Sequence, residues 1–198
     1  MGVRAANKQA TRERVLAAAR ELFDSVGFEA TTVRLIAQRA GVAVGSVFTG
    51  FASKAEILGH VMADRLGALY AELDRVLPHL RGHTADRLRS VMAIHYNFEM
   101  RHPRMFMAYV GAAYDGGAGV LPLGRNAHLK GMLRDILVGG IERGEVSPQV
   151  DLDLFVDALL GVHMWNYRLV AYEAWDAQAL TDLMDRQIGL LMDGACSR

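Results

Sequence analysis

The chain has 198 residues, of which 52% are hydrophobic and 22% are charged, and its 22 basic side chains balance 22 acidic ones. This composition excludes a disordered or fibrous protein, because there is ample apolar surface to bury in a core. The single cysteine excludes a disulfide framework and a multi-cysteine zinc site. The polar start and the absence of a long apolar run lead us to expect a cytoplasmic protein with no membrane partner.

The zero net charge argues at first sight against a nucleic-acid binder, but it hides a gradient. Residues 1–60 carry eight basic and five acidic side chains, for a net charge of +3. Residues 61–198 carry 14 basic and 17 acidic side chains, for a net charge of −3. The N-terminal third is therefore the candidate for contact with an anionic polymer. The alternative is a solvated surface with a chance asymmetry of charge.

The first 50 residues show the spacing of three helices. Apolar residues recur at helical intervals over about 11–26, and Gly27 follows where a left-handed C-terminal cap belongs. Thr31 and Thr32 begin a short second helix, which Gly41 closes. A third short element is expected over about 43–49. Two short helices separated by a glycine-containing turn are typical of a helix-turn-helix, whose later helix enters the major groove of DNA.

The rest of the chain is also predicted to be helical. Ser53 and Glu56 form a capping box, in which each side chain accepts the other's terminal N–H, and start a long helix that ends near Pro78. The glycine-rich segment between Gly111 and Gly124 is predicted to be a flexible connection. No segment alternates like a strand, so we assign an all-α fold of about nine helices. Five later helices are expected over about 84–101, 103–113, 122–143, 152–173 and 176–194.

The N-terminal motif resembles a known family. Residues 11–58, TRERVLAAARELFDSVGFEATTVRLIAQRAGVAVGSVFTGFASKAEIL, look like the DNA-binding domain of the TetR/AcrR family of transcriptional regulators. The glycines, the Thr-Thr-Val cap, the Ala-x-x-Ala-Gly-Val turn, the aromatic pair and the final Ser-Lys fall at family spacing. The resemblance implies a helix-turn-helix domain over 1–55 and a ligand-binding and dimerisation domain over 56–198. It also implies a homodimer that binds a palindromic operator in double-stranded DNA and releases it when a small-molecule effector binds.

The resemblance places the family's contacts to phosphate and to base edges on particular residues. The implied DNA-binding residues are Thr32, Arg34, Ala43, Val44, Ser46, Phe48, Thr49 and Lys54. This chain departs from the family pattern in having Phe48 where a tyrosine is usual, and Gly50 where a histidine or tyrosine is frequent. Because the segment from Ala43 to Gly50 holds no charge, we expect readout through methyl contacts to thymine and through DNA shape.

The helix expected over 152–173 is apolar on more than one face, so it must be buried on several sides. With the last helix and a second copy of the chain it would form a four-helix bundle, as in the family. The alternative is packing within one chain only. The expected dimerisation residues are Phe155, Leu159, Val162, Asn166, Leu180, Met184, Ile188 and Leu191.

Methionines and aromatic residues gather beyond residue 60. Such side chains can line an adaptable apolar pocket, although any single one more often fills a core. Together with the family resemblance, they predict a small, largely apolar effector with one or two polar groups. The expected ligand-binding residues are Met62, Leu66, Met92, His95, Tyr96, Glu99, Phe106, Tyr109, His163 and Tyr167.

His95, Glu99 and His102 fall at i, i+4 and i+7, a spacing that suits a divalent metal ion, and His163 could add a ligand. However, His102 directly precedes Pro103, where a helix usually ends, and three polar groups on one face are typical of a solvated surface. We therefore assign no metal and no cofactor, and leave the ion-binding question open.

The family resemblance implies a ligand-responsive repressor, which is the function we predict. The sequence carries no nucleophile motif, phosphate-binding loop or dinucleotide fingerprint, so we do not predict an enzyme. Two alternatives remain. One is a helical binding or adaptor protein whose helix-turn-helix is degenerate. The other is an enzyme that uses His95, Glu99 or His163.

Overall fold

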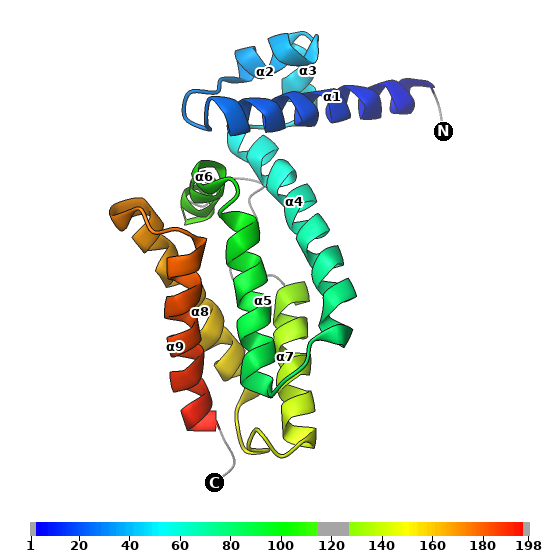
Figure 1. Ribbon diagram of the computed structural model, residues 1–198. Helices are drawn as coiled ribbons and strands as arrows, with labels where there is room; N and C mark the ends of the chain where they lie inside the picture. Colours follow the sequence, from blue (N-terminus) through cyan, green and yellow to red (C-terminus); the bar gives the residue numbers. More distant parts are fainter. Residues whose placement is uncertain (1–2, 115–126, 196–198) are drawn as a thin grey trace. The chain divides into compact units, whose positions relative to one another are not determined.

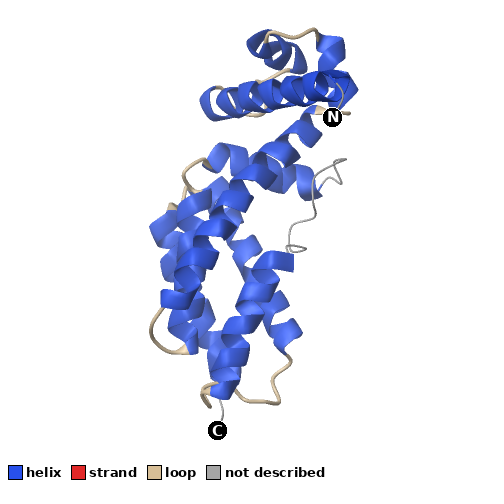
Figure 2. Cartoon of the chain, turned by 90° about the vertical axis from the view of Figure 1, so that its right-hand side faces the viewer, coloured by secondary structure: helices blue, strands red, loops and turns tan. Residues whose placement is uncertain are grey.

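The computed structural model describes residues 3–114 and 127–195, and Figure 1 shows the order of its helices. These residues form nine α-helices and one short 3-10 helix, with no strand among them (Figure 2). The all-α prediction is confirmed. Within the same ranges, no helix is both long enough and apolar enough to cross a membrane.

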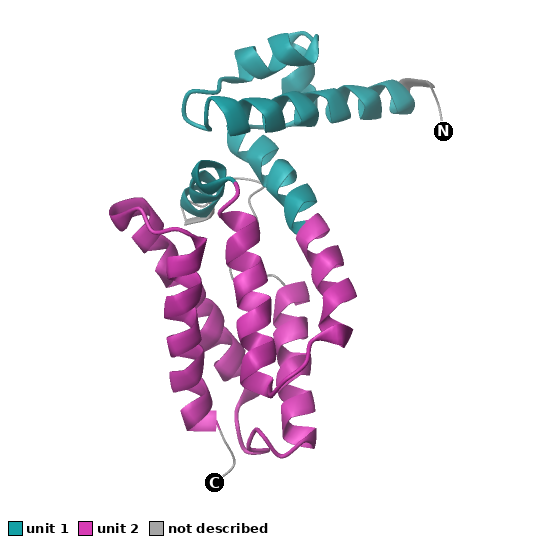
Figure 3. Cartoon of the chain, viewed as in Figure 1, with its two compact units in different colours: residues 1–66, 102–122 teal, residues 67–101, 123–198 magenta. Residues whose placement is uncertain are grey.

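Contacts between residues divide the chain into two compact units (Figure 3). Unit 1 comprises Met1–Leu66 and His102–Pro122, and unit 2 comprises Gly67–Arg101 and Leu123–Arg198. The division falls within one helix, α4 (Lys54–Val76), which contributes residues to both units. The predicted functional boundary between residues 55 and 56 stays a prediction.

Unit 1 holds the three N-terminal helices, which pack against one another, and α6, which packs against α1 (Figure 1). Its core is made by the apolar faces of these helices together with the first turns of α4. Members of that core include Val15, Ala19, Phe23, Ile36, Val47, Phe51, Ile57, Leu58 and Val61. The helices are α1 (Val3–Ser25), α2 (Val33–Ala40), α3 (Val44–Gly50) and α6 (Pro103–Tyr114).

The ends of the first helices follow from single residues. Gly27 and Gly41 adopt left-handed φ angles of 88° and 65°, which glycine reaches without strain, and so they end α1 and α2 as predicted. Thr32 is the N-cap of α2, and its hydroxyl accepts a hydrogen bond from the Leu35 N–H at 3.1 Å. However, α1 begins at Val3, well before the predicted start near residue 11. Residues 5–10 near its start are exposed, so no apolar period marks them in the sequence.

The predicted capping box before α4 is present in a different form. The Ser53 hydroxyl accepts a hydrogen bond from the Glu56 N–H at 3.0 Å, as expected. The Glu56 carboxylate, however, accepts its hydrogen bond from the Ala52 N–H at 2.5 Å and not from Ser53. The side chain thus reaches one residue further back than the motif predicts.

Unit 2 is a bundle in which α5 packs against α7 and α9, and α8 packs against the same two helices. The prediction of residues 152–173 for α8 agrees with the structure at both ends. The predicted helix over 84–101 ends two residues early, at Glu99. Much of the connection predicted between Gly111 and Gly124, and the first residues of the helix predicted to follow it, lie outside the described residues. The helices are α5 (Thr84–Glu99), α7 (Ala127–Glu142), α8 (Leu152–Glu173) and α9 (Ala177–Ala195).

Candidate functional site

The outward side of α3 is a small, uncharged surface. Val47 is buried and anchors the helix in unit 1, whereas Phe48 is 53% exposed and Val44 is 37% exposed. Ser46 and Thr49 are also exposed, and the Thr49 hydroxyl donates to the Gly45 carbonyl oxygen at 3.0 Å. We call Val44, Ser46, Phe48 and Thr49 the α3 face. It offers methyl groups, an aromatic ring and hydroxyl groups, which can meet thymine methyls and groove edges.

Arg12 on α1 holds the C-terminal end of α3. Its guanidinium donates to the Gly50 carbonyl oxygen at 2.9 Å and lies 4.3 Å from the ring centre of Phe51, which is buried. It also lies 2.7 Å from the His60 ring nitrogen Nε2. The sequence prediction missed this role, because nothing in the spacing of Arg12 marks it as a contact to a residue 38 positions away.

A groove runs between α1 and α3, lined by Asn7, Lys8 and Thr11 from α1 and by Ser46 and Thr49 from α3, among others. Lys8 is exposed there. It adds a cation beside the otherwise uncharged α3 face, and so it is a candidate phosphate contact that the sequence prediction did not include. Its place in the first turns of α1, where no apolar period is visible, explains the omission.

The three residues expected to contact phosphate lie in different surroundings. Thr32 and Arg34 are exposed at the start of α2. The Lys54 ammonium, in contrast, donates to the carbonyl oxygens of Phe28 at 2.7 Å and Glu29 at 3.4 Å, and it lies 4.1 Å from the Phe28 ring centre. The structure therefore gives Lys54 partners within its own chain, and its contact with phosphate stays a prediction.

Unit 2 contains a cluster of polar and aromatic side chains from α5 and α8. The two histidine rings lie 5.2 Å apart between centres, and the Tyr96 and Tyr167 rings lie 4.6 Å and 5.1 Å from the His163 ring. Each member is at least nine-tenths buried. We call the following residues the buried polar cluster: His95, Tyr96, Glu99, His163, Asn166 and Tyr167.

The part of the cluster around Asn166 and Tyr96 is held by hydrogen bonds. Asn166 and Gln187 exchange amide hydrogen bonds at 2.7 Å and 3.2 Å, which ties α8 to α9. Asn166 also donates to the Tyr96 hydroxyl at 3.1 Å, and that hydroxyl donates to the His163 carbonyl oxygen at 3.3 Å. Burial raises the pKa of Tyr96, so the phenol stays protonated and able to donate.

The other side of the cluster brings two histidines around a carboxylate. His95 Nδ1 lies 2.8 Å from Glu99 Oε1, and His163 Nε2 lies 3.8 Å from Glu99 Oε2. Burial raises the pKa of Glu99, which the neighbouring His95 only partly opposes. Burial also holds the pKa of His163 well below its ordinary value, and His95 adds to that effect. His163 is therefore neutral near pH 7.

The structure corrects the expected grouping of His95, Glu99 and His102. Because α5 ends at Glu99, His102 does not continue its face, and its Nδ1 lies 2.8 Å from Asp24 Oδ1 in unit 1. Instead, His163 of α8 is the third residue that lies close to His95 and Glu99. The expectation of a solvated polar face is also wrong, since His95 and Glu99 are buried.

The remaining residues of the predicted effector site are divided between the two units. Met92 is buried on α5 in unit 2. Met62 and Leu66 on α4, and Phe106 and Tyr109 on α6, belong to unit 1. Their participation in one pocket stays a prediction.

The sequence prediction missed Tyr70, whose hydroxyl lies 3.5 Å from His95 Nε2. A pattern could have revealed it, because Tyr70 continues the four-residue spacing of Met62 and Leu66.

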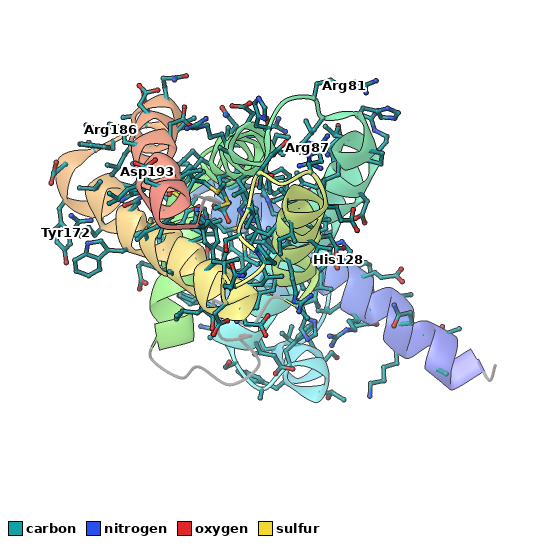
Figure 4. The ribbon with its side chains drawn as sticks, turned by 90° about the horizontal axis from the view of Figure 1, so that it is seen from below. Arg81, Arg87, His128, Tyr172, Arg186 and Asp193 are labelled. Atoms are coloured by element: carbon teal, nitrogen blue, oxygen red, sulfur yellow. The ribbon has the colours of Figure 1, made fainter. Side chains whose placement is uncertain are left out.

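Most residues predicted for dimerisation are buried inside a single chain: Phe155, Leu159, Asn166, Leu180, Met184 and Ile188. Val162 and Leu191 are half-buried. The exposed apolar side chains of the same helices are Leu154, Trp165 and Tyr172 on α8 and Leu190 on α9, each at least 64% exposed. Figure 4 shows Tyr172 projecting outward. The predicted residues are therefore mostly interior, and we name the four exposed side chains of the two helices the α8–α9 face.

The comparisons with known proteins match transcriptional regulators. The family model described as bacterial regulatory proteins, tetR family, matches residues 15–61. The HTH-type transcriptional repressor KstR2 of Mycobacterium tuberculosis is 30% identical over 148 residues, which cover 72% of each chain. Thermus thermophilus FadR, a TetR-family repressor solved with lauroyl-CoA, aligns with a TM-score of 0.74 at 24% identity over 94% of this chain and 96% of its own. The solved structure of M. tuberculosis KstR2 aligns with a TM-score of 0.61 at 23% identity over 94% of this chain and 95% of its own. These two structures share the fold.

Proposed function

The chain belongs to the tetR family of bacterial regulatory proteins, and we propose that it is a ligand-responsive transcriptional repressor. The observation that carries the proposal is the α3 face. An apolar ring and a valine side chain stay exposed on a seven-residue helix that is held at its other side by Val47 and Arg12. Exposed apolar groups of this kind are typical of a binding surface.

The proposed target is a palindromic operator bound by a homodimer, in which each α3 face reads one half-site in the major groove. Thr32, Arg34 and Lys8 would contact phosphates beside it. Because the α3 face is uncharged, few phosphates are neutralised and non-specific binding is expected to be weak and lost early as salt rises. A protein with this role works where the chromosome is, in the cytoplasm.

The α8–α9 face is the proposed dimer surface. Leu154, Trp165 and Tyr172 recur at intervals of 11 and 7 residues along α8, so they lie along one side of that helix. A second copy of the chain would cover these side chains, and the exposed Leu190 of α9, isologously.

The proposed effector is a small, largely apolar molecule that binds in the helical region beyond residue 56. Support comes from the buried polar cluster, which offers a few hydrogen-bonding groups in apolar surroundings, as effector pockets do. FadR of Thermus thermophilus and RolR, which have the same fold, were solved with lauroyl-CoA and resorcinol. Effector binding would favour a dimer whose two α3 helices no longer match successive half-sites, which lowers DNA affinity. A regulator of this kind needs no catalytic step.

The test measures, by fluorescence anisotropy, how tightly the full chain binds DNA fragments that flank its own gene. We expect one fragment to bind at least about a thousandfold more tightly than a scrambled duplex. Arg34→Ala should weaken binding to all duplexes. The matched control is Arg81→Ala, an exposed arginine in the loop before α5 (Figure 4), which should leave binding unchanged. If no flanking fragment is bound even at low salt, the adaptor alternative replaces the repressor.

A further inference from the structure

The His95–Glu99–His163 triad contains buried polar atoms that no hydrogen bond satisfies. Its side chains are only 3–4% exposed. Among the residues that the structure describes, His95 Nδ1, Glu99 Oε2 and His163 Nδ1 are buried and have no hydrogen-bond partner. Buried polar atoms without partners are rare in native proteins, because each costs free energy, and they call for an explanation such as a bound ion.

A simple ion pair between His95 and Glu99 does not account for this geometry. His95 Nδ1 approaches Glu99 Oε1 to 2.8 Å, but this contact leaves the second carboxylate oxygen, Oε2, without a hydrogen-bond partner. Nor does any lysine or arginine in the described ranges form an ion pair with Glu99. The carboxylate therefore has only the two histidine rings as neighbours of possible positive charge, and buried carboxylates are normally paired or coordinate a metal.

We propose that His95, Glu99 and His163 form a binding site for one divalent transition-metal ion, for which Zn²⁺ is the best match. Two imidazoles and one carboxylate are a common three-ligand set for zinc. One ligand atom from each residue lies within 4.8 Å of the others. Ligands at about 2.0–2.2 Å from a shared zinc ion lie at most about 4 Å apart, so small side-chain rotations close the triad around an ion.

The surroundings of the triad suit this role. The Tyr70 hydroxyl lies 3.5 Å from His95 Nε2, the ring nitrogen opposite the one that faces Glu99. Metal-ligating histidines usually bond through one nitrogen while a neighbour orients the other. His163 can offer its unpartnered Nδ1 once its ring turns, since Nε2 already lies 3.2 Å from the Tyr167 hydroxyl. A divalent cation would balance the charge of the buried Glu99 carboxylate. The ion would link α5 to α8 inside unit 2.

The proposal is tested on the full chain, purified with any affinity tag removed and stripped with a chelator. Titration with Co²⁺ should give one ion per chain and the visible absorption of a low-symmetry cobalt site, and Zn²⁺ should abolish that absorption by displacement. Glu99→Gln and His163→Gln should each weaken cobalt binding at least about tenfold. His128→Gln is the control, because His128 is an exposed histidine on α7 (Figure 4), and it should bind as the unaltered chain does.

The proposal is wrong if the stripped, unaltered chain binds no stoichiometric Co²⁺, or if both triad variants bind Co²⁺ as tightly as it does. Should a variant fail to fold, crystals of the unaltered chain soaked in ZnCl₂ decide the matter. An anomalous peak at the zinc edge is expected among the three side chains, and a peak elsewhere or none contradicts the site. These measurements use no DNA, so their outcome is independent of the proposed repressor function.

Discussion

The ammonium of Lys54 donates a hydrogen bond to the Phe28 carbonyl oxygen at 2.7 Å and lies 4.1 Å from the centre of the Phe28 ring. The contact joins the first residue of α4 to the turn between α1 and α2. A cation that the family resemblance assigns to phosphate thus has partners within its own unit. The two roles make different predictions.

Lys54→Met should destabilise the protein by about 1–2 kcal/mol, because a charge-assisted hydrogen bond and a cation–π contact are lost while the apolar stem is kept. Chemical denaturation measures this change. The salt dependence of DNA binding should stay the same, whereas Arg34→Gln should reduce the slope by about one. A smaller slope in Lys54→Met would instead assign Lys54 to phosphate.

Glu145 caps α5 from a distant part of the chain. Its Oε2 accepts hydrogen bonds from the Thr84 N–H and hydroxyl, each at 2.6 Å, and its Oε1 accepts one from Arg143 at 2.9 Å. These hydrogen bonds hold the pKa of Glu145 well below its usual range, and the bond from Arg143 contributes most. Glu145→Gln should therefore cost about 1–3 kcal/mol at pH 7.

The pH dependence follows from the lowered pKa. A carboxylate whose folded-state pKa is depressed contributes stability above its unfolded pKa of about 4, and loses that contribution as the pH falls. The difference in unfolding free energy between the unaltered chain and Glu145→Gln should thus shrink below about pH 4. Glu142→Gln, at an exposed neighbouring carboxylate, serves as the control. A difference that persists unchanged at acid pH would contradict the capping role.

Two glycines in α7 should respond oppositely to alanine. A Cβ at Gly131 would meet no described atom within 4 Å, so Gly131→Ala should stabilise the protein by about 0.5–1 kcal/mol. A Cβ at Gly140 would lie 2.3 Å from Thr84 Oγ1 and 2.8 Å from Val146 Cγ2. Gly140→Ala should therefore destabilise by about 1–3 kcal/mol. Thermal unfolding of both variants checks the pair, and equal shifts would refute the packing described for α7.

Trp165 is the expected anchor of the dimer. It is 64% exposed within one chain, and Arg168 lies 4.5 Å from its ring centre. Trp165→Asp should raise the dissociation constant of the dimer about thirtyfold or more, as loss of an interface hot spot does. Analytical ultracentrifugation measures the change. Val26→Asp, at an exposed valine of unit 1, should leave the dimer intact, and a Trp165→Asp variant that stays equally dimeric would place the interface elsewhere.

The sequence predicts most helix ends well, because a local feature such as a capping glycine or the end of an apolar period determines each of them. Gly27 and Gly41 end helices through conformations that other residues avoid, and the apolar period of α8 marks both of its ends. The start of α1 was missed because a polar, exposed helix carries no such period. Local rules therefore predict the elements whose ends are determined locally.

The functional residues were harder to predict, since they depend on contacts between distant segments. His102 shares a spacing with His95 and Glu99, but the end of α5 separates it from them, and His163 on α8 takes its place. Likewise, spacing along α8 and α9 identifies apolar residues without showing which of them one chain already buries. Phe155 and Met184 proved to be interior, while Trp165 and Leu190 are exposed.

The most direct test of the central claim is selection of DNA from a random duplex pool by the full chain at low salt. We expect enrichment of an inverted repeat with two half-sites spaced for successive major grooves, and loss of that enrichment when the α3 face is altered by Val44→Glu. A pool that shows no enriched inverted repeat after repeated rounds would contradict a dimeric operator-binding regulator.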